Sequence, residues 1–117
     1  MVASLYSSSR NRGGDINLIQ LLLPLYDNHG QALPKTLFAQ VRDELVEQFG
    51  GLTAYTRAPV DGLWREDDNH AVHDDLVIYE VMACELDRAW WANYRALLET
   101  RFRQEQLLIR AQRVEIL

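Results

Sequence analysis

The residues best suited to chemistry are a carboxylate and a guanidinium that lie on two separate predicted strands. Glu80 lies between Ile78 and Met82 at alternating positions of an apolar stretch, where an unpaired ionisable side chain is costly to bury. Arg110 lies on a later predicted strand, and Gln20 lies on an earlier one. Strand alternation places these three polar side chains on one face of a common sheet. There Glu80 could act as a base or substrate anchor, with Arg110 binding an anion.

The same pair also has a structural interpretation, which we favour. Glu80 and Arg110 could form an ion pair that sets the register of a dimer, because ion-pair networks perturb acids without catalysing a reaction. Alternation along the predicted strand 52–58 adds Tyr55 and Arg57 to the same face. The candidate catalytic residues are therefore Glu80 and Arg110, and the candidate ligand-binding residues are Gln20, Tyr55, Arg57, Glu80 and Arg110.

A second group of possible ligands lies in the polar segment 66–75. Its imidazoles and carboxylates are of the kind that bind zinc, manganese or iron. His70 and His73 are three positions apart, a spacing that puts both rings on one side of a helix but on opposite faces of a strand. A hairpin loop of solvated acids explains the same composition. We therefore expect 67–75 to be a mobile loop, with no metal site, and we expect the chain to hold no cofactor.

Aromatic residues and catalytic motifs add little to this picture. Trp90, Trp91 and Tyr94 suit core and interface packing, with ligand stacking as the alternative. The sequence has no glycine-rich phosphate loop, no nucleophile elbow and no catalytic-triad signature.

The elements that would position these residues follow from hydrophobic periodicity. Two segments repeat apolar residues at spacings of three and four, which predicts helices, and four segments are apolar or alternating, which predicts strands. Asp87 suits a helix N-cap, and Gly50 suits the left-handed cap that ends the first helix. The predicted order is strand 16–26, helix 34–49, strand 52–58, strand 76–82, helix 87–102 and strand 107–116.

This βαββαβ order predicts a ferredoxin-like α+β fold. Right-handed crossovers place both helices on one face of a four-stranded antiparallel sheet with strand order 4-1-3-2. The segment 1–14 is polar and rich in serine and glycine, which indicates a flexible N-terminal arm. A single domain over 15–117 is expected.

The helix-free face of that sheet would be unusually apolar. Exposing its five aliphatic side chains would forgo on the order of ten kcal/mol, and patches of that kind usually mark an interface. The arm could fold over the patch, but its composition makes it a poor lid. We therefore expect a homodimer packed sheet against sheet. The five residues are Leu18, Leu22, Ile78, Met82 and Leu108.

Composition limits the class of protein. The 117 residues are 48% hydrophobic and 25% charged, which is typical of a globular domain. A net charge of −5 disfavours nucleic acid as a partner, no stretch is long enough to span a bilayer, and no signal-peptide pattern is present. Cys84 is the single cysteine, which we expect to be buried as a small hydrophobe closing a strand. These features indicate a cytoplasmic protein.

The sequence resembles two groups of known proteins. The architecture over 15–117 resembles the dimeric α+β barrel group of ferredoxin-like folds, which includes monooxygenases and isomerases. The strings GGLTAY at 50–55, GLW at 62–64 and DRAWW at 87–91 resemble small uncharacterised bacterial proteins. The group shares no universal catalytic motif, so the resemblance assigns no site residue here.

Two functions follow as hypotheses. The apolar majority of the helix-free face favours a non-catalytic dimerisation or small-ligand-binding module. The alternative is a small dimeric α+β barrel enzyme, of isomerase or monooxygenase type, acting on a small organic molecule.

Overall fold

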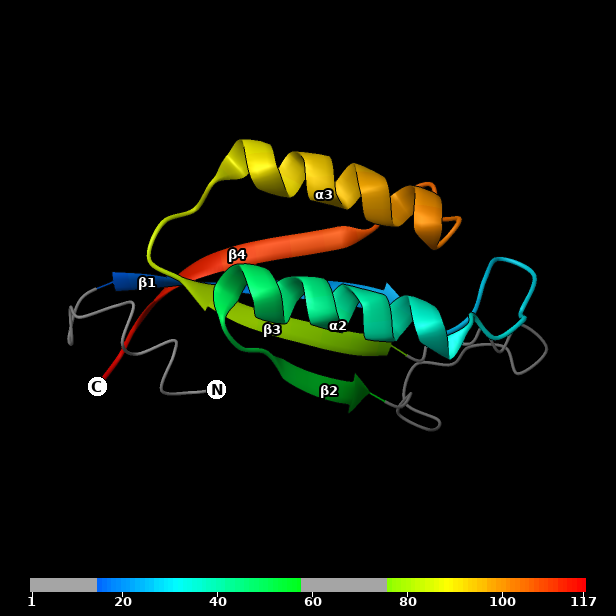
Figure 1. Ribbon diagram of the computed structural model, residues 1–117, viewed down its shortest axis with the longest axis horizontal. Coiled ribbons are helices and arrows are strands. Elements are labelled where there is room, and N and C mark those ends of the chain that lie inside the picture. Colours follow the sequence, from blue (N-terminus) through cyan, green and yellow to red (C-terminus); the bar gives the residue numbers. More distant parts are fainter. Residues whose placement is uncertain (1–14, 58–75) are drawn as a thin grey trace, which may run out of the picture.

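A computed structural model describes residues 15–57 and 76–117. Its sheet is four-stranded and antiparallel, with the order β2-β3-β1-β4, so the predicted 4-1-3-2 arrangement and the α+β fold class are confirmed. The elements follow the predicted βαββαβ order (Figure 1). They are β1 (Asp15–Pro24), α2 (Lys35–Phe49), β2 (Thr53–Arg57), β3 (Leu76–Ala83), α3 (Arg88–Arg101) and β4 (Leu108–Glu115).

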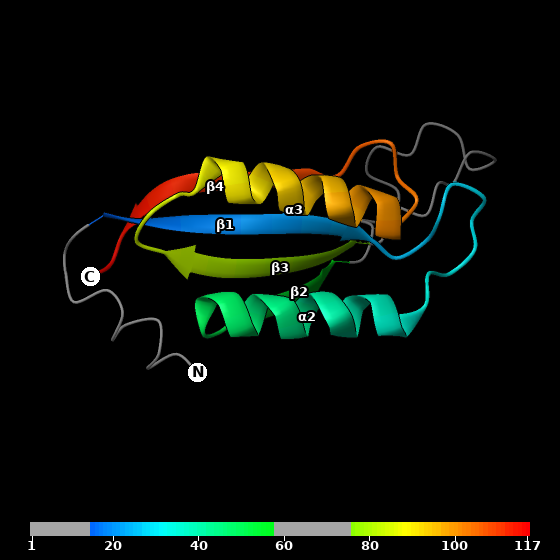
Figure 2. The same ribbon diagram turned by 45° about the horizontal axis from the view of Figure 1, so that its top comes forward.

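Both helices pack against the same side of the sheet (Figure 1 and Figure 2). In the described part of the chain, the opposite side of the sheet carries no helix. The helix ends agree with the sequence. Gly50 has a φ of 84° and its N–H donates to the carbonyl oxygen of Val46. Asp87 caps α3, because its carboxylate accepts a hydrogen bond of 3.0 Å from the backbone N–H of Trp90.

The core lies between the helices and the sheet. Leu21 and Leu23 of β1 are fully buried there, and so are Val41 and Leu45 of α2. Leu18, Gln20 and Leu22 lie on the other face and are half-buried, whereas Ile16 on that face is buried. The period-2 assignment of the first strand is therefore confirmed. The remaining buried apolar residues of the core cluster are Ile19, Leu33, Tyr79, Val81, Trp91, Tyr94, Leu98, Phe102 and Leu107.

Trp90 and Trp91 of α3 both contact Phe49 of α2, so they pack between the two helices. The rings of Trp91 and Phe49 stack with centroids 5.3 Å apart, and those of Trp90 and Tyr94 stack at 4.9 Å. Adjacent helix positions point about 100° apart, so the two indoles leave α3 in different directions. Phe49 of α2 nevertheless contacts both of them. The aromatic side chains of α3 thus join the helix layer into one packed unit.

Some expectations fail or fall outside the description. Cys84 is exposed, not buried, because β3 ends at Ala83 and the cysteine begins the connection to α3. The first strand ends at Pro24, two residues before the predicted end. The segments 1–14 and 67–75, with His70 and His73, lie outside the described residues. Within the described residues, no helix is long and apolar enough to cross a membrane, and no three histidine, cysteine or acidic side chains cluster as metal ligands.

Candidate functional site

The sheet register brings the three predicted polar residues side by side on the helix-free face. Gln20 of β1 is the Cα partner of Glu80 on β3 and of Arg110 on β4. The Nε2 atom of Gln20 donates a 2.7 Å hydrogen bond to Oε2 of Glu80. The Nε atom of Arg110 donates a 2.9 Å hydrogen bond to Oε1 of Gln20. The Gln20 side-chain amide therefore directs its nitrogen toward the Glu80 carboxylate and its oxygen toward the Arg110 guanidinium.

Tyr55 of β2 adds a fourth member. Its hydroxyl donates a 3.1 Å hydrogen bond to Oε1 of Glu80, and this bond to a carboxylate raises the pKa of the phenol above its usual value. Tyr55, Glu80, Gln20 and Arg110 together form a line across all four strands of the sheet, which we call the polar row. The acid lies toward one edge of the sheet and the guanidinium at the other.

The expected direct ion pair is replaced by a relay, in which two hydrogen bonds through the Gln20 amide connect Glu80 with Arg110. Among the described residues, Glu80 and Arg110 make no direct contact, because the strand between them interposes the Gln20 amide. The terminal guanidinium nitrogens of Arg110 make no hydrogen bond within the described part of the chain. Arg57 ends β2 opposite Leu76, and its side chain lies outside the description. The structure therefore joins four of the five candidate ligand-binding residues.

Aliphatic side chains flank the polar row on both sides. Leu22 pairs with Ile78 and with Leu108 on one side of the row, and Leu18 pairs with Met82 on the other. Four of these side chains are half-buried by their neighbours on the sheet, while Leu108 is 52% exposed. The bare apolar area is thus smaller than the sequence alone predicted, because adjacent strands bring these side chains into mutual contact.

The geometry of this face suits a covering protein surface better than an enclosed reaction site. Glu80 is held by two donors, and Tyr55 is 46% exposed. Two hollows lie beside α3 and β4, and one of them includes Arg110 in its lining, but neither includes Glu80, Gln20 or Tyr55. A proton-transfer site needs a substrate held within hydrogen-bonding reach of its base. On the single chain, the row lies on an open, partly apolar surface.

Sequence reasoning missed two features. The first is an ion pair between the helices, in which both terminal nitrogens of Arg101 donate 2.8 Å hydrogen bonds to the Glu44 carboxylate. Tyr94 donates a third hydrogen bond of 2.8 Å to the same carboxylate. Nothing local to either helix predicts which of its charged residues will face the other helix.

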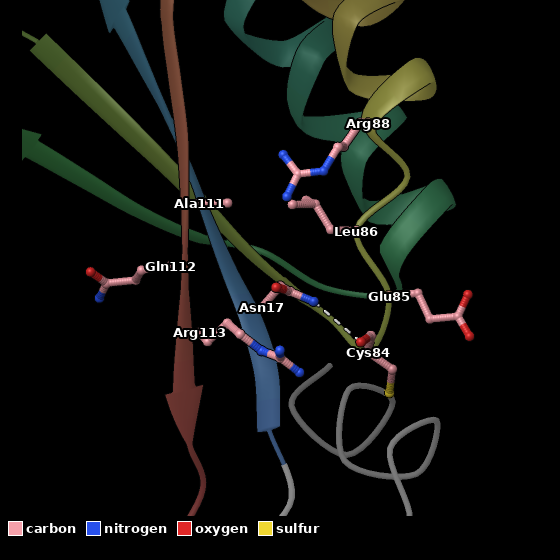
Figure 3. Close-up of a pocket in the computed structure, with 8 residues that line it drawn as sticks. All are labelled: Asn17, Cys84, Glu85, Leu86, Arg88, Ala111, Gln112 and Arg113. Carbon is pink, nitrogen blue, oxygen red and sulfur yellow. Dashed lines mark hydrogen bonds between the residues drawn. The ribbon is translucent and has the colours of Figure 1, made fainter.

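The second feature is a hollow between β4 and the start of α3, with a volume of about 490 Å³ (Figure 3). Arg88 overhangs it from α3, and Arg113 reaches it from β4. The buried amide of Asn17 lies in its wall. The available signal was the placement of Arg88, Ala92 and Arg95 at helical spacing on one stripe of α3.

Comparisons with known proteins leave the family open. No family model and no curated protein matches the chain. A solved structure of a phage SAM lyase in its apo state is similar at 13% sequence identity, covering 89% of this chain and 83% of that one, with a TM-score of 0.39. The chain is a small α+β protein. The polar row must be interpreted from its own geometry.

The relay predicts that Gln20 is the most sensitive member of the row. Gln20→Leu should lower the free energy of unfolding by about 1–2 kcal/mol, because it removes a donor from a half-buried carboxylate and an acceptor from Arg110. Gln112→Leu is the matched control, since Gln112 lies on the same face, is exposed, and makes no side-chain hydrogen bond to a described residue. Denaturant unfolding of both variants measures the difference. Equal effects at the two positions would show that the relay does not stabilise the fold.

Coupling along the row is testable in the same way. Glu80→Gln and Arg110→Met should each destabilise the protein, and in combination they should show a coupling energy of about 0.5 kcal/mol or more, transmitted through Gln20. The coupling should vanish when the cycle is repeated in Gln20→Leu. Additive effects with Gln20 present would rule out the relay.

Proposed function

We propose that this chain is a non-catalytic dimerisation module of bacterial type, in which two copies pack their helix-free faces together as in the dimeric α+β barrel group. One observation carries the proposal. The helix-free face combines half-buried aliphatic side chains with a polar row whose inner members are already satisfied by each other. Such a face can be covered without leaving Glu80 or Gln20 buried and lacking hydrogen-bond partners. Two sheets packed face to face lie about 10 Å apart, with the side chains of the two inner faces interdigitating.

The order of charges along the polar row supports a second copy as the occupant. The row runs from the Tyr55–Glu80 end on β2 and β3 to Arg110 on β4. A two-fold axis parallel to the strands would set β4 of one copy over β2 of its partner. Arg110 would then face the acidic end of the partner's row, where its terminal nitrogens could donate to the partner's Glu80.

The same axis also preserves the apolar contacts. It keeps each residue at its height along the strand, so the Leu22 side of one row packs on the Leu22 side of the other. An axis perpendicular to the strands would instead stack Arg110 on Arg110, which like-charge repulsion disfavours. The chain is thus self-complementary in one orientation only.

The test of this function is the mass of the protein in solution. Sedimentation at several micromolar loadings should give twice the chain mass of 13.6 kDa, because the apolar rows need covering. A mass that stays at one chain across the loadings would overturn both the dimer and the proposed function.

A small dimeric enzyme is the second candidate, and one observation favours it. The row places a phenol and a carboxylate 3.1 Å apart on the same face as a guanidinium with unpaired terminal nitrogens in the described structure. Those groups could move a proton on, and anchor, a small organic anion. A high-resolution crystal structure separates the candidates. Protein side chains covering Glu80 favour the module, whereas an enclosed cavity with unexplained density beside Glu80 favours the enzyme.

We place the module in the cytoplasm. The single cysteine supports this location, since small domains of oxidising compartments usually rely on disulfides. The balance of acidic over basic residues supports a protein partner over nucleic acid.

A further inference from the structure

The groove between α3 and β4 has the composition of a binding site. The hollow of about 490 Å³ continues into a second one of about 290 Å³ along α3, and Leu86, Arg88 and Ala111 line both. We call the two together the α3–β4 groove. Its larger hollow lies between β4 and the start of α3 (Figure 3), and Arg110 is the one member of the polar row that lines the smaller hollow. The larger hollow contains no member of the polar row, so a function placed there does not depend on the dimer proposed above.

Positive charge borders the groove in a chain whose net charge is −5. Arg88 and Arg95 lie seven positions apart on one stripe of α3, and Arg113 lies on the helix-facing side of β4. Among the described residues, two of these arginines contact acids at long distances, Arg95 to Glu99 at 3.8 Å and Arg113 to Asp15 at 3.4 Å. All three guanidinium groups can therefore turn toward an anion in the groove.

Arg88 is the least engaged of the three. Within residues 15–57 and 76–117 its guanidinium makes no hydrogen bond or ion pair. Figure 3 shows it directed over the hollow beside Leu86, whereas the one glutamate in the lining, Glu85, points away. The adjacent helix end is already capped by Asp87, so attraction for an anion has to come from the arginine side chains.

The smaller hollow of the groove has an apolar floor. Ile19 and Trp91 are buried beneath it, at 1% and 7% exposure, and Leu86 and Ala111 form its sides. Polar residues also line the larger hollow, among them Asn17 and Gln112. Asn17 is 8% exposed, and its Nδ2 atom donates to the carbonyl oxygens of Ala83 and Cys84. Its Oδ1 atom accepts no hydrogen bond from a described residue, so it can accept one from a bound molecule.

We propose that the α3–β4 groove binds a small organic anion with an apolar body, of the carboxylate class. The carboxylate would pair with Arg88, with Arg113 as the second cation, and the body would lie against Leu86 and Ala111. A hydrogen-bond donor on the ligand would pair with Asn17. The guanidinium selects the charge, and the apolar floor selects against strongly hydrated inorganic ions.

A titration with a charged probe and its neutral isostere tests the site. Benzoate, followed by ¹H–¹⁵N NMR, should shift the amides of Leu86, Ala92 and Ala111 with a saturable, millimolar dissociation constant. Benzamide has the same shape without the charge and should bind at least fivefold more weakly. Arg88→Gln should weaken benzoate binding at least fivefold. Arg42→Gln should leave it unchanged, since Arg42 is an exposed arginine of α2 beside Asp43.

Three results would overturn the proposal. They are equal binding of benzoate and benzamide, equal binding by the wild type and Arg88→Gln, or shifts scattered over the surface without saturation. The NMR spectrum also reports whether Arg88→Gln is folded. Arg113→Gln provides a second variant, in which benzoate binding should weaken about twofold or more.

Discussion

Replacing Leu22 with arginine is expected to convert the proposed dimer into a monomer. Leu22 lies on the central strand β1, in the middle of the aliphatic group that it forms with Ile78 of β3 and Leu108 of β4. In the dimer, a guanidinium there would be buried opposite the partner's aliphatic side chains without a carboxylate. We expect the dissociation constant to rise at least about a thousandfold, equivalent to ~4 kcal/mol.

The control for this experiment is an equally hydrophobic residue on the other layer. Leu97 lies on α3 and is 44% exposed, so Leu97→Arg should leave the mass in solution unchanged. Leu108→Arg guards against a folding defect, because Leu108 is 52% exposed in the single chain and an arginine fits there without strain. Circular dichroism confirms that the variants are folded. A folded Leu22→Arg or Leu108→Arg protein that sediments as a dimer would exclude the helix-free face as the interface.

Removing the ion pair between the helices is expected to have the second large effect. Glu44→Gln should lower the free energy of unfolding by about 2 kcal/mol at pH 7, because it replaces a bidentate, charge-assisted contact with Arg101. The Arg101 side chain is 19% exposed and that of Glu44 is 34% exposed, so solvent reduces the 3–5 kcal/mol that is typical of a fully buried pair. Glu47→Gln is the control, since Glu47 is an exposed carboxylate of the same helix.

The pH dependence of this effect has a definite sign. The hydrogen bond from Arg101, and then that from Tyr94, lower the pKa of the Glu44 carboxyl below its usual value of 4.5 despite partial burial. A lowered pKa in the folded state adds stability that is fully present above 4.5 and is lost as the pH falls through the lowered pKa. The difference between the wild type and Glu44→Gln should therefore shrink between pH 5 and pH 3, measured by denaturant unfolding. A constant difference over that range would show that the carboxylate charge contributes nothing.

The fold was predictable because each element carries its own local signal. Alternation along β1 separates Leu21 and Leu23 from Gln20 and Leu22, and the structure buries the first pair while leaving the second half-buried. The cap at Asp87 likewise depends on residues close to it in sequence. The polar row was predictable in part for the same reason, since the face of each member follows from alternation.

Features that depend on distant contacts were not predictable. The sequence indicated that Glu80 and Arg110 share a face, but the bridge through Gln20 depends on strand order, register and the orientation of one amide. The partner of Glu44 depends on how two helices lie on the sheet. The α3–β4 groove depends on how the connection after Ala83 leaves the sheet, and the exposure of Cys84 has the same cause.

The strand order has a consequence for how the protein folds. The first half of the chain supplies β1 and β2, and the second supplies β3 and β4, yet every strand pairing joins one half to the other. Among residues 15–57 and 76–117, neither half contains a hydrogen-bonded ladder of its own, so the described strands of one half need those of the other to form the sheet. We therefore expect a single all-or-none transition with no half-folded intermediate. The chain must close long loops before any ladder forms, which slows folding relative to a helical protein of this length.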